Sequence, residues 1–341
     1  MITKLMAKFN LANLNYLFNW VAFINFYYLS YTRFSSLIHK YYFTFVAGPT
    51  CQEINSDPLD TNQICGILEN KKEIIEHLGS YLAGLIEGDG YISITNQNRV
   101  ILGITFNIKD KPLAEKLLNY LGKGFIATRK TNSIELRFSE KKTIIRIITL
   151  INGKFRTPKI EQLYKLIDWV NNKYSMDISK LPLDKSPLSQ NSWLTGFIDA
   201  DGGFYIRYSL KQILCKFALE QRMIYPKTGE SYYTVLNEIC LFLNVKLSIR
   251  DRLNYKNSYY IIRVENQNST KILIDYLNKY PLLSSKYLDF LEWAKSFKII
   301  SNKAHMTVQG KHIILAAKNN MNDKRTNFNW EHLNFLECRV P

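Results

Sequence analysis

The chain has 341 residues, of which 46% are hydrophobic and 22% charged, as in a globular protein of about two domains. It carries 45 Lys and Arg against 29 Asp and Glu, a formal net charge of +16. This excess indicates a polyanionic partner, either nucleic acid or an anionic membrane. It argues against a partner that is itself strongly basic. The plain alternative is a basic solvated surface, but the 22 tyrosines favour nucleic acid because aromatic rings stack on bases.

The cysteines exclude two further classes of small protein. They are five in number, scattered, and form no CxxC pair: Cys51, Cys65, Cys215, Cys240 and Cys338. Neither a disulfide framework nor a zinc finger is supported, and the five histidines add no ligand spacing. The chain therefore reads as a protein of a reducing compartment.

Residues 1–75 differ from the remainder and are expected to form a leader outside the working fold. The stretch 14–31 has nearly the length of a membrane-spanning helix, but three amides interrupt it: Asn15, Asn19 and Asn25. It is not the Arg- and Ser-rich segment of a transit peptide. Proline and glycine near positions 48–58 then indicate a linker. Membrane attachment through 14–31 stays open as an alternative.

A regular pattern begins at residue 76, and the first repeat is expected to span 76–181. An apolar helix ends near residue 90, and alternating polar and apolar residues predict two strands directly after it. Pro112 opens the next helix, which stops at Gly122. The remaining predicted elements are strands at 125–130 and 134–138 and helices at 141–151 and 160–171. The order is αββαββα, closed by a further helix.

The same order recurs after a linker at 182–191 that is rich in Pro, Ser and Asp. The second repeat is expected to span 192–300, with a C-terminal extension at 301–341. Its predicted strands lie at 204–207, 215–222, 246–253 and 259–265, and its later helices at 232–243, 270–280 and 286–298. The fold class is therefore α+β, with one unit duplicated and fused.

The strongest signal is a short string that occurs twice. LAGLIEGDG at 82–90 returns as LTGFIDADG at 194–202, and every position keeps the same numbering offset (201 − 89 = 112). Each copy carries small residues four apart, Gly84 with Gly88 and Gly196 with Ala200. Such residues lie on one helix face and let two backbones approach closely. A plain core helix with a C-terminal glycine would explain one copy, but two matched copies indicate a packed pair.

Each string carries an aspartate before its final glycine, Asp89 or Asp201, at a helix C-terminus, where a carboxylate is unfavourable. Two such carboxylates meeting at adjacent helix ends also repel each other. This repeated conflict is typical of a divalent-cation site, and hard oxygen ligands with few protein groups suit Mg²⁺. A metal between two carboxylates and a phosphate would activate water, so the site predicts phosphodiester hydrolysis.

These two strings resemble the motifs of the LAGLIDADG homing endonucleases in the double-motif, single-chain form, over about residues 76–300. The resemblance implies two αββαββα repeats about a pseudo-two-fold axis, each with a curved four-stranded antiparallel sheet and with the motif helices at the interface. It implies that Asp89 and Asp201 bind the metal, which is Mg²⁺ with Mn²⁺ as a substitute. It implies further that the carbonyl groups of Gly88 and Ala200 assist them.

The family also places a basic residue near each scissile phosphate, and Lys159 and Lys286 match each other in context. Each precedes an amphipathic helix that contains a tryptophan. Their separations from the aspartates along the chain differ (159 − 89 = 70 against 286 − 201 = 85). Helix capping or simple phosphate binding stays open for both lysines.

The resemblance implies that the sheets lie along the major groove of double-stranded DNA. Strand alternation assigns Ile92, Ile94, Leu102, Ile104 and Phe106 to the core. The residues expected to face DNA are Ser93, Thr95, Thr105, Asn107, Glu135 and Arg137 in the first half, and Tyr205, Arg207, Ser209, Lys216, Glu220 and Arg222 in the second. Arg137, Arg207 and Arg222 are the best candidates for guanine contacts. A register slip of one residue would exchange the faces.

The leading hypothesis is a monomeric, sequence-specific, Mg²⁺-dependent endonuclease that makes a staggered double-strand break in a long, pseudo-palindromic target. The alternative implied by the resemblance is an RNA-binding maturase that assists group I intron splicing. A composition rich in Asn, Lys, Ile, Tyr and Phe indicates an AT-biased gene. Together with the resemblance, it favours a mitochondrial intron reading frame.

Overall fold

The computed structural model describes residues 61–129, 131–209, 211–251 and 258–337. Both predicted repeats lie in one compact unit, which begins at Leu68. Most of the predicted leader, including 14–31, falls outside the described residues. The helix that carries the first motif, α2 (Thr61–Asp89), begins well before position 76, where the first repeat was expected to start. Within the described part of the chain, no helix combines the length and apolarity needed to cross a membrane.

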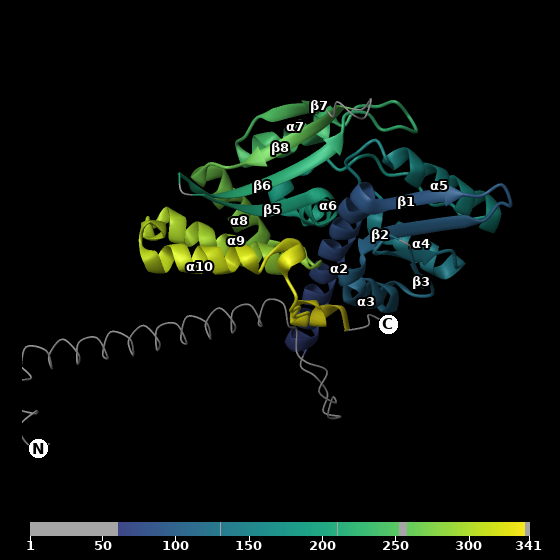
Figure 1. Ribbon diagram of the computed structural model, residues 1–341. Coiled ribbons are helices and arrows are strands. Elements are labelled where there is room, and N and C mark those ends of the chain that lie inside the picture. The colour runs from purple at the N-terminus through teal and green to yellow at the C-terminus, as the bar shows by residue number, and fades with distance from the viewer. Residues whose placement is uncertain (1–60, 130, 210, 252–257, 338–341) are drawn as a thin grey trace, which may run out of the picture. The chain divides into compact units, whose positions relative to one another are not determined.

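The first repeat has the predicted αββαββα order with one closing helix (Figure 1). Its strands form one antiparallel sheet in the order β1-β2-β4-β3. The strands are β1 (Gly90–Ile94), β2 (Val100–Asn107), β3 (Phe125–Thr128) and β4 (Ser133–Phe138). The helices after α2 are α3 (Lys111–Leu121), α4 (Lys141–Ile151) and α5 (Ile160–Tyr174), with a short 3-10 turn η1 (Ile108–Asp110) before α3.

The second repeat has the same topology, and its sheet runs in the order β5-β6-β8-β7. A 3-10 turn, η2 (Leu188–Gln190), precedes it in the predicted linker. The strands are β5 (Gly202–Tyr208), β6 (Ile213–Arg222), β7 (Leu247–Asp251) and β8 (Ser258–Val264). The helices are α6 (Trp193–Asp201), α7 (Tyr233–Leu243), α8 (Gln267–Lys279) and α9 (Lys286–Ser301). The α+β duplication expected from the sequence is therefore confirmed.

One face of each sheet is buried under its helices, as the alternation of the strands requires. In the first sheet Ile92, Leu102, Ile104 and Phe106 are buried as predicted. Ile94 is not: it is 39% exposed, because it is the last residue of β1, which is an edge strand of the sheet. The register is otherwise as expected, so the opposite face of each sheet carries the polar set.

The C-terminal extension returns from the second repeat to the first. Helix α10 (Val308–Asn319) packs against α9 after the turn η3 (Ala304–Met306), and the chain then passes through η4 (Asn322–Lys324). Its last described segment, η5 (Glu331–Glu337), packs on α3 of the first repeat. His332 stacks on Tyr287 with ring centroids 4.3 Å apart and bonds the Leu283 carbonyl at 3.1 Å. The extension therefore ties the two halves together.

Candidate active site at the paired motif helices

Helices α2 and α6 meet through their glycines. A Cβ built on Gly84 would lie 2.0 Å from the Trp193 carbonyl oxygen, and one on Gly196 would lie 1.9 Å from that of Tyr81. A Cβ on Gly88 would lie 2.2 Å from the Cβ of Ala200. These contacts are reciprocal, so the small residues at spacing four do let the two backbones touch along one seam.

This seam brings the two motif ends together, so that Asp89 and Asp201 share one site. A Cβ on Gly88 would lie 3.1 Å from Asp201 Oδ2. Burial and, secondly, the neighbouring Asp89 carboxylate raise the pKa of Asp201 to about 7, against the opposing effect of Lys286 and Lys159. Solvent reaches Asp89 more readily, yet partial burial still raises its pKa against the lowering effect of Lys286 and Lys159. The two carboxylates therefore repel each other as the sequence predicted.

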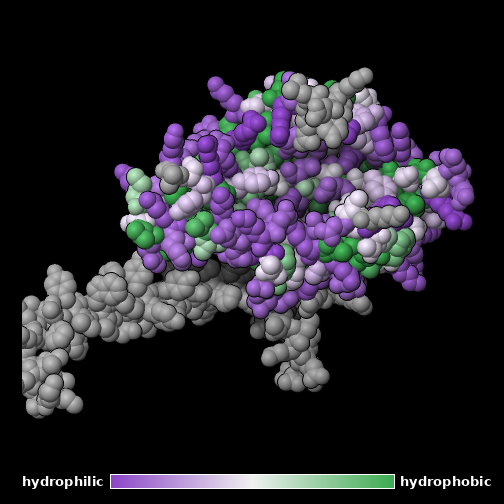
Figure 2. Space-filling view, in the orientation of Figure 1, coloured by the Kyte–Doolittle hydropathy of each residue, from purple (hydrophilic) through white to green (hydrophobic). Residues whose placement is uncertain are grey.

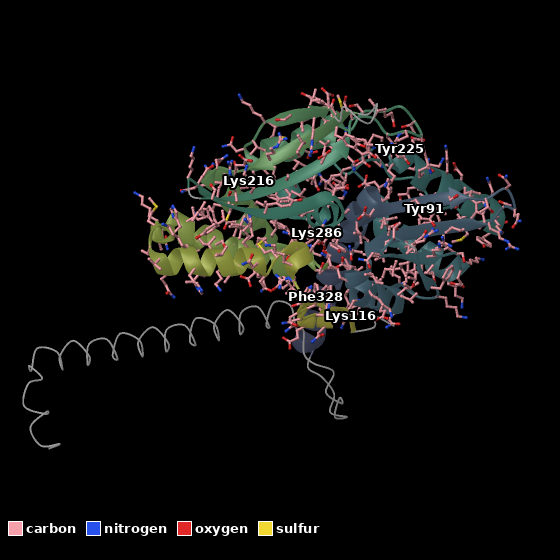
Figure 3. The ribbon with its side chains drawn as sticks, in the orientation of Figure 1. Tyr91, Lys116, Lys216, Tyr225, Lys286 and Phe328 are labelled. Carbon is pink, nitrogen blue, oxygen red and sulfur yellow. The ribbon has the colours of Figure 1, made fainter. Side chains whose placement is uncertain are left out.

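Lys159 and Lys286 occupy equivalent positions, although they lie at different distances along the chain from their aspartates. The Lys159 ammonium donates to the carbonyls of Ile86, Gly88 and Gly90 at 3.0, 3.2 and 2.9 Å. The Lys286 ammonium donates to those of Ile198, Asp199 and Ala200 at 3.2, 2.7 and 2.9 Å. In Figure 3 Lys286 lies near the junction of the two halves. Each lysine thus places its positive charge on the C-terminus of its own motif helix.

Burial lowers the pKa of both ammonium groups, that of Lys159 to about 8, while the nearby carboxylates oppose the shift. The capping role left open by the sequence is therefore present, although the capped helix is the motif helix and not the one each lysine precedes. Both lysines also lower the pKa of Asp201, so their charges lie within electrostatic reach of the paired carboxylates.

The residues present fit a divalent cation with few protein ligands. No group of three or more His, Cys, Asp or Glu suited to a metal occurs within the described ranges. Two carboxylates and the carbonyls of Gly88 and Ala200 remain as donors, and each carbonyl oxygen that accepts from a lysine keeps a second lone pair. Mg²⁺ commonly binds one or two carboxylates and completes its shell with water and substrate phosphate.

The sequence did not predict one side chain that contacts Asp201. Gln221 Nε2, near the end of β6, donates to Asp201 Oδ2 at 3.0 Å. Asp89 has no such amide neighbour among the residues described, so the two halves of the site differ. The sequence carries no signal for this contact, because a lone glutamine near a strand end has no pattern.

The outer face of the first sheet holds a polar cluster that was only partly predicted. Glu135 accepts hydrogen bonds from Tyr91, Arg129 and Arg137, with the Arg137 contact at 2.8 Å. Burial alone would raise the pKa of Glu135, but these donors lower it to about 2. Arg137 is thus half-buried in an ion pair and lies over the Phe125 ring. It is a fixed side chain on the expected face, not a free one.

The other predicted contacts of the first half are spread along the same sheet. Ser93 and Thr105 are exposed on its outer face. Thr95 is half-buried and its hydroxyl accepts from the Arg99 amide at 3.2 Å. The Asn107 side chain accepts from the Lys109 amide at 3.1 Å. Thr95 and Asn107 therefore shape turns at the ends of strands.

In the second half Tyr205, Arg207 and Arg222 are exposed. Lys216 is paired with Glu265 at 2.7 Å, and Ser209 closes the β5–β6 turn by donating to the Gln212 carbonyl at 3.0 Å. Glu220, expected on this face, pairs with Arg250 at 2.9 Å.

The sheets also carry three basic residues that were not among the predicted DNA contacts, although strand alternation could have indicated them: Arg129, Arg250 and Arg263. Figure 2 shows that hydrophilic residues cover most of the visible face and that hydrophobic ones form only separate patches. The predicted contacts together with these arginines give both sheets a predominantly basic outer face.

Each of the two repeats matches the same known protein family. The family model described as LAGLIDADG endonuclease matches residues 82–170 and again 194–297. The intron-encoded DNA endonuclease aI3 of Saccharomyces cerevisiae is 32% identical over 314 residues, covering 78% of this chain and 76% of its own length. An uncharacterized cox1 intron-2 protein of Schizosaccharomyces pombe is 33% identical, covering 68% of this chain and 69% of its own.

Two other similarities bear on function and on fold. The intron-encoded RNA maturase bI4 of Saccharomyces cerevisiae is 28% identical over 60% of this chain, which spans only 30% of that protein. The crystal structure of the I-LtrWI LAGLIDADG homing endonuclease bound to target DNA matches with a TM-score of 0.55 at 20% identity, covering 74% of this chain and all of that one. The structural match supports the two-repeat fold.

Proposed function

The chain belongs to the LAGLIDADG endonuclease family, and from this premise we propose that it is a homing endonuclease that makes a staggered double-strand break in a long, pseudo-palindromic DNA target. The observation that carries the proposal is the reciprocal glycine contact of α2 and α6, which unites Asp89 and Asp201 at one site. A basic sheet face on each side of that site suits a duplex.

Asp89 and Asp201, with the carbonyls of Gly88 and Ala200, would hold Mg²⁺ or Mn²⁺. The metal, when bound, supplies an activated water and stabilises the leaving oxygen of the phosphodiester. The two aspartates would hold the metal beside the scissile phosphates, and Lys159 and Lys286 place further positive charge there. With its pKa lowered to about 8, Lys159 can also give or take a proton near neutral pH.

Sequence would be read by the outer faces of the two sheets. Arg207 and Arg222 are exposed and project from β5 and β6, so they are available for guanine edges in the major groove. Arg137 is held by Glu135 in a fixed orientation, which suits a single base contact. Since the two faces differ in nearly every side chain, the target would be only loosely palindromic.

The test is cleavage of a randomised duplex library in Mg²⁺. We expect Asp89→Asn and Asp201→Asn to lower double-strand cleavage by about a hundredfold or more, because each removes charge from the reacting centre. Asp168→Asn is the matched control, since Asp168 only pairs with Lys180 at the surface. Unchanged cleavage by the doubly substituted protein would refute the assignment.

A maturase activity is the second candidate, favoured by the similarity to the bI4 maturase. Binding of intron RNA would use a basic surface and not the aspartates. The Asp89→Asn, Asp201→Asn double variant should then keep RNA binding and splicing support while it loses cleavage. We also propose a mitochondrial location and a monomer, because the relatives are intron-encoded and one chain supplies both halves of the site.

A further inference from the structure

Each nine-residue motif string contains a second acidic residue, and both of these are buried in the interface. Glu87 is 0% exposed and Asp199 is 6% exposed. They stand two positions before Asp89 and Asp201, but they have no role in the proposed cleavage. A buried carboxylate is costly unless it is well hydrogen-bonded, so the partners of these two residues show what they hold.

Asp199 holds the loop that presents Lys286. It accepts from the backbone amides of Leu283 and Ser284 at 2.8 and 3.1 Å, and from the Ser284 hydroxyl at 2.5 Å. The same Ser284 oxygen accepts from the backbone amide of Lys286 at 3.1 Å. Asp199 therefore holds the loop at the start of α9, and with it the lysine, together with Asp110, which accepts from the Ser285 amide at 2.7 Å.

Glu87 does the same for Lys159. It accepts from the amides of Arg156 at 3.0 Å and Thr157 at 2.6 Å, and Thr157 Oγ1 accepts from the Lys159 amide at 3.2 Å. The two loops correspond position by position, since the lysines and the hydroxyl residues share one offset (286 − 159 = 284 − 157 = 127). This offset differs from that of the motifs, so the matched geometry indicates that the contact itself is maintained.

The remaining donor to each carboxylate comes from the other half of the protein. Tyr81 of α2 donates its hydroxyl to Asp199 at 2.9 Å, and Trp193 of α6 donates its indole N–H to Glu87 at 2.5 Å. Tyr81 and Trp193 occupy the same place in the two repeats, because each directly precedes its motif string. Tyr81 is 2% exposed and Trp193 is 0% exposed, so water cannot replace either donor.

We propose that Tyr81 and Trp193 are positioning residues that act across the interface, each fixing the active-site lysine of the opposite repeat through that repeat's buried carboxylate. Tyr81 thus serves Lys286, and Trp193 serves Lys159. The inference rests on the proposed nuclease function, and it adds that each half of the site depends on an aromatic residue of the other repeat. Damage to one repeat would slow the cut that depends on the other.

The test measures the nicking rate of each strand of one selected target duplex, labelled separately, with Mg²⁺ and the full chain. Lys286→Met identifies the strand that depends on Lys286, and Lys159→Met the other. We expect Tyr81→Phe, which keeps the ring and loses only the hydroxyl, to slow the Lys286 strand roughly tenfold relative to the other. Trp193→Phe should slow the Lys159 strand.

Tyr276→Phe is the matched control, because Tyr276 is also buried but its hydroxyl bonds backbone groups and neither buried acid: it donates to the Asn191 carbonyl at 2.9 Å and accepts from the Thr195 amide at 3.2 Å. It should leave the strand ratio unchanged. The ratio is internal to each sample, so a partly unfolded variant does not alter it. Equal slowing of both strands by Tyr81→Phe, or slowing of the same strand by Tyr81→Phe and Trp193→Phe, overturns the inference.

Failure of the premise would look different. If the unsubstituted protein cuts no duplex, the nuclease proposal itself fails. If Lys286→Met slows both strands equally, the pairing of one lysine with one strand is wrong and this inference falls, although the protein remains a nuclease.

Discussion

Gly196→Ala tests whether the close approach of α2 and α6 sets the active-site geometry. The new Cβ would lie 1.9 Å from the Tyr81 carbonyl oxygen and 2.8 Å from the Leu85 nitrogen. Both atoms belong to the α2 backbone, so no side chain can rotate away. Since ordinary carbon–oxygen contacts lie near about 3.3 Å or more, the helices must separate by roughly 1.4 Å.

The cost follows from two opposed effects. Overpacking costs about 3 kcal/mol at the upper end of the usual range, while Ala in place of Gly in a helix returns about 1 kcal/mol. The net loss is about 2 kcal/mol of unfolding free energy, or roughly 4–8 °C in Tm for a unit of this size. A shift of about 1 Å in reacting groups costs about a hundredfold in rate, so activity should fall further than stability suggests.

The assays are thermal denaturation and cleavage of the selected target at a temperature where the variant is folded. Gly229→Ala is the control: Gly229 has a φ of +77° and open space around it, so alanine costs about 1–2 kcal/mol of backbone strain in the loop between β6 and α7, without pushing α2 and α6 apart. It should lower Tm and preserve cleavage. A Gly196→Ala protein with full activity, or equal loss in both variants, would refute the reasoning.

Three further outcomes are expected. Because the pKa of Glu135 is lowered from 4.5 to about 2, its ionised form stabilises the fold above about pH 4.5, and that contribution is lost as pH falls toward 2. In urea unfolding, the free energy of unfolding of Glu135→Gln should fall furthest below that of the parent at neutral pH, and the two should converge in acid. A difference in unfolding free energy that does not change with pH would contradict this. Arg207→Ala, at an exposed side chain, should relax base preference at one target position by about 1–3 kcal/mol in competition binding without changing Tm. Arg137→Ala should relax base preference and also lower Tm, because Glu135 loses a partner. Equal Tm values for the two variants would argue against the fixed role of Arg137. EDTA should stop cleavage and added Mg²⁺ or Mn²⁺ should restore it, and cutting that persists in EDTA would exclude the metal site.

The repeat architecture was predictable because it depends on local periodicity. The limits of α4 match the prediction at both ends, and the strand alternation placed Leu102 and Ile104 in the core. The exposure of Ile94 could not be foreseen, since it depends on the place of β1 at the edge of the sheet, which alternation along one strand does not reveal. Likewise, periodicity showed that Arg137 faces outward but not that Glu135 holds it there.

The partners of the site were harder to predict because they are joined in space and not along the chain. The equivalence of Lys159 and Lys286 was obscured because the second repeat is longer between its aspartate and its lysine. The extra length lies in connections, such as the longer one between β6 and α7, and leaves both ammonium groups on the same helix carbonyls. Only three-dimensional contact separates this kind of match from chance.

The reciprocal bonds across the interface also limit how such proteins can be recombined. Trp193 meets the longer Glu87, whereas Tyr81 meets the shorter Asp199. A half taken from another family member would bring its own aromatic donor and its own acid, and these must match in reach with those of the retained half. Hybrid enzymes assembled from unmatched halves should fold around the glycine seam and still cut poorly. The aromatic donor and the acid that it contacts should therefore be replaced together when halves are combined.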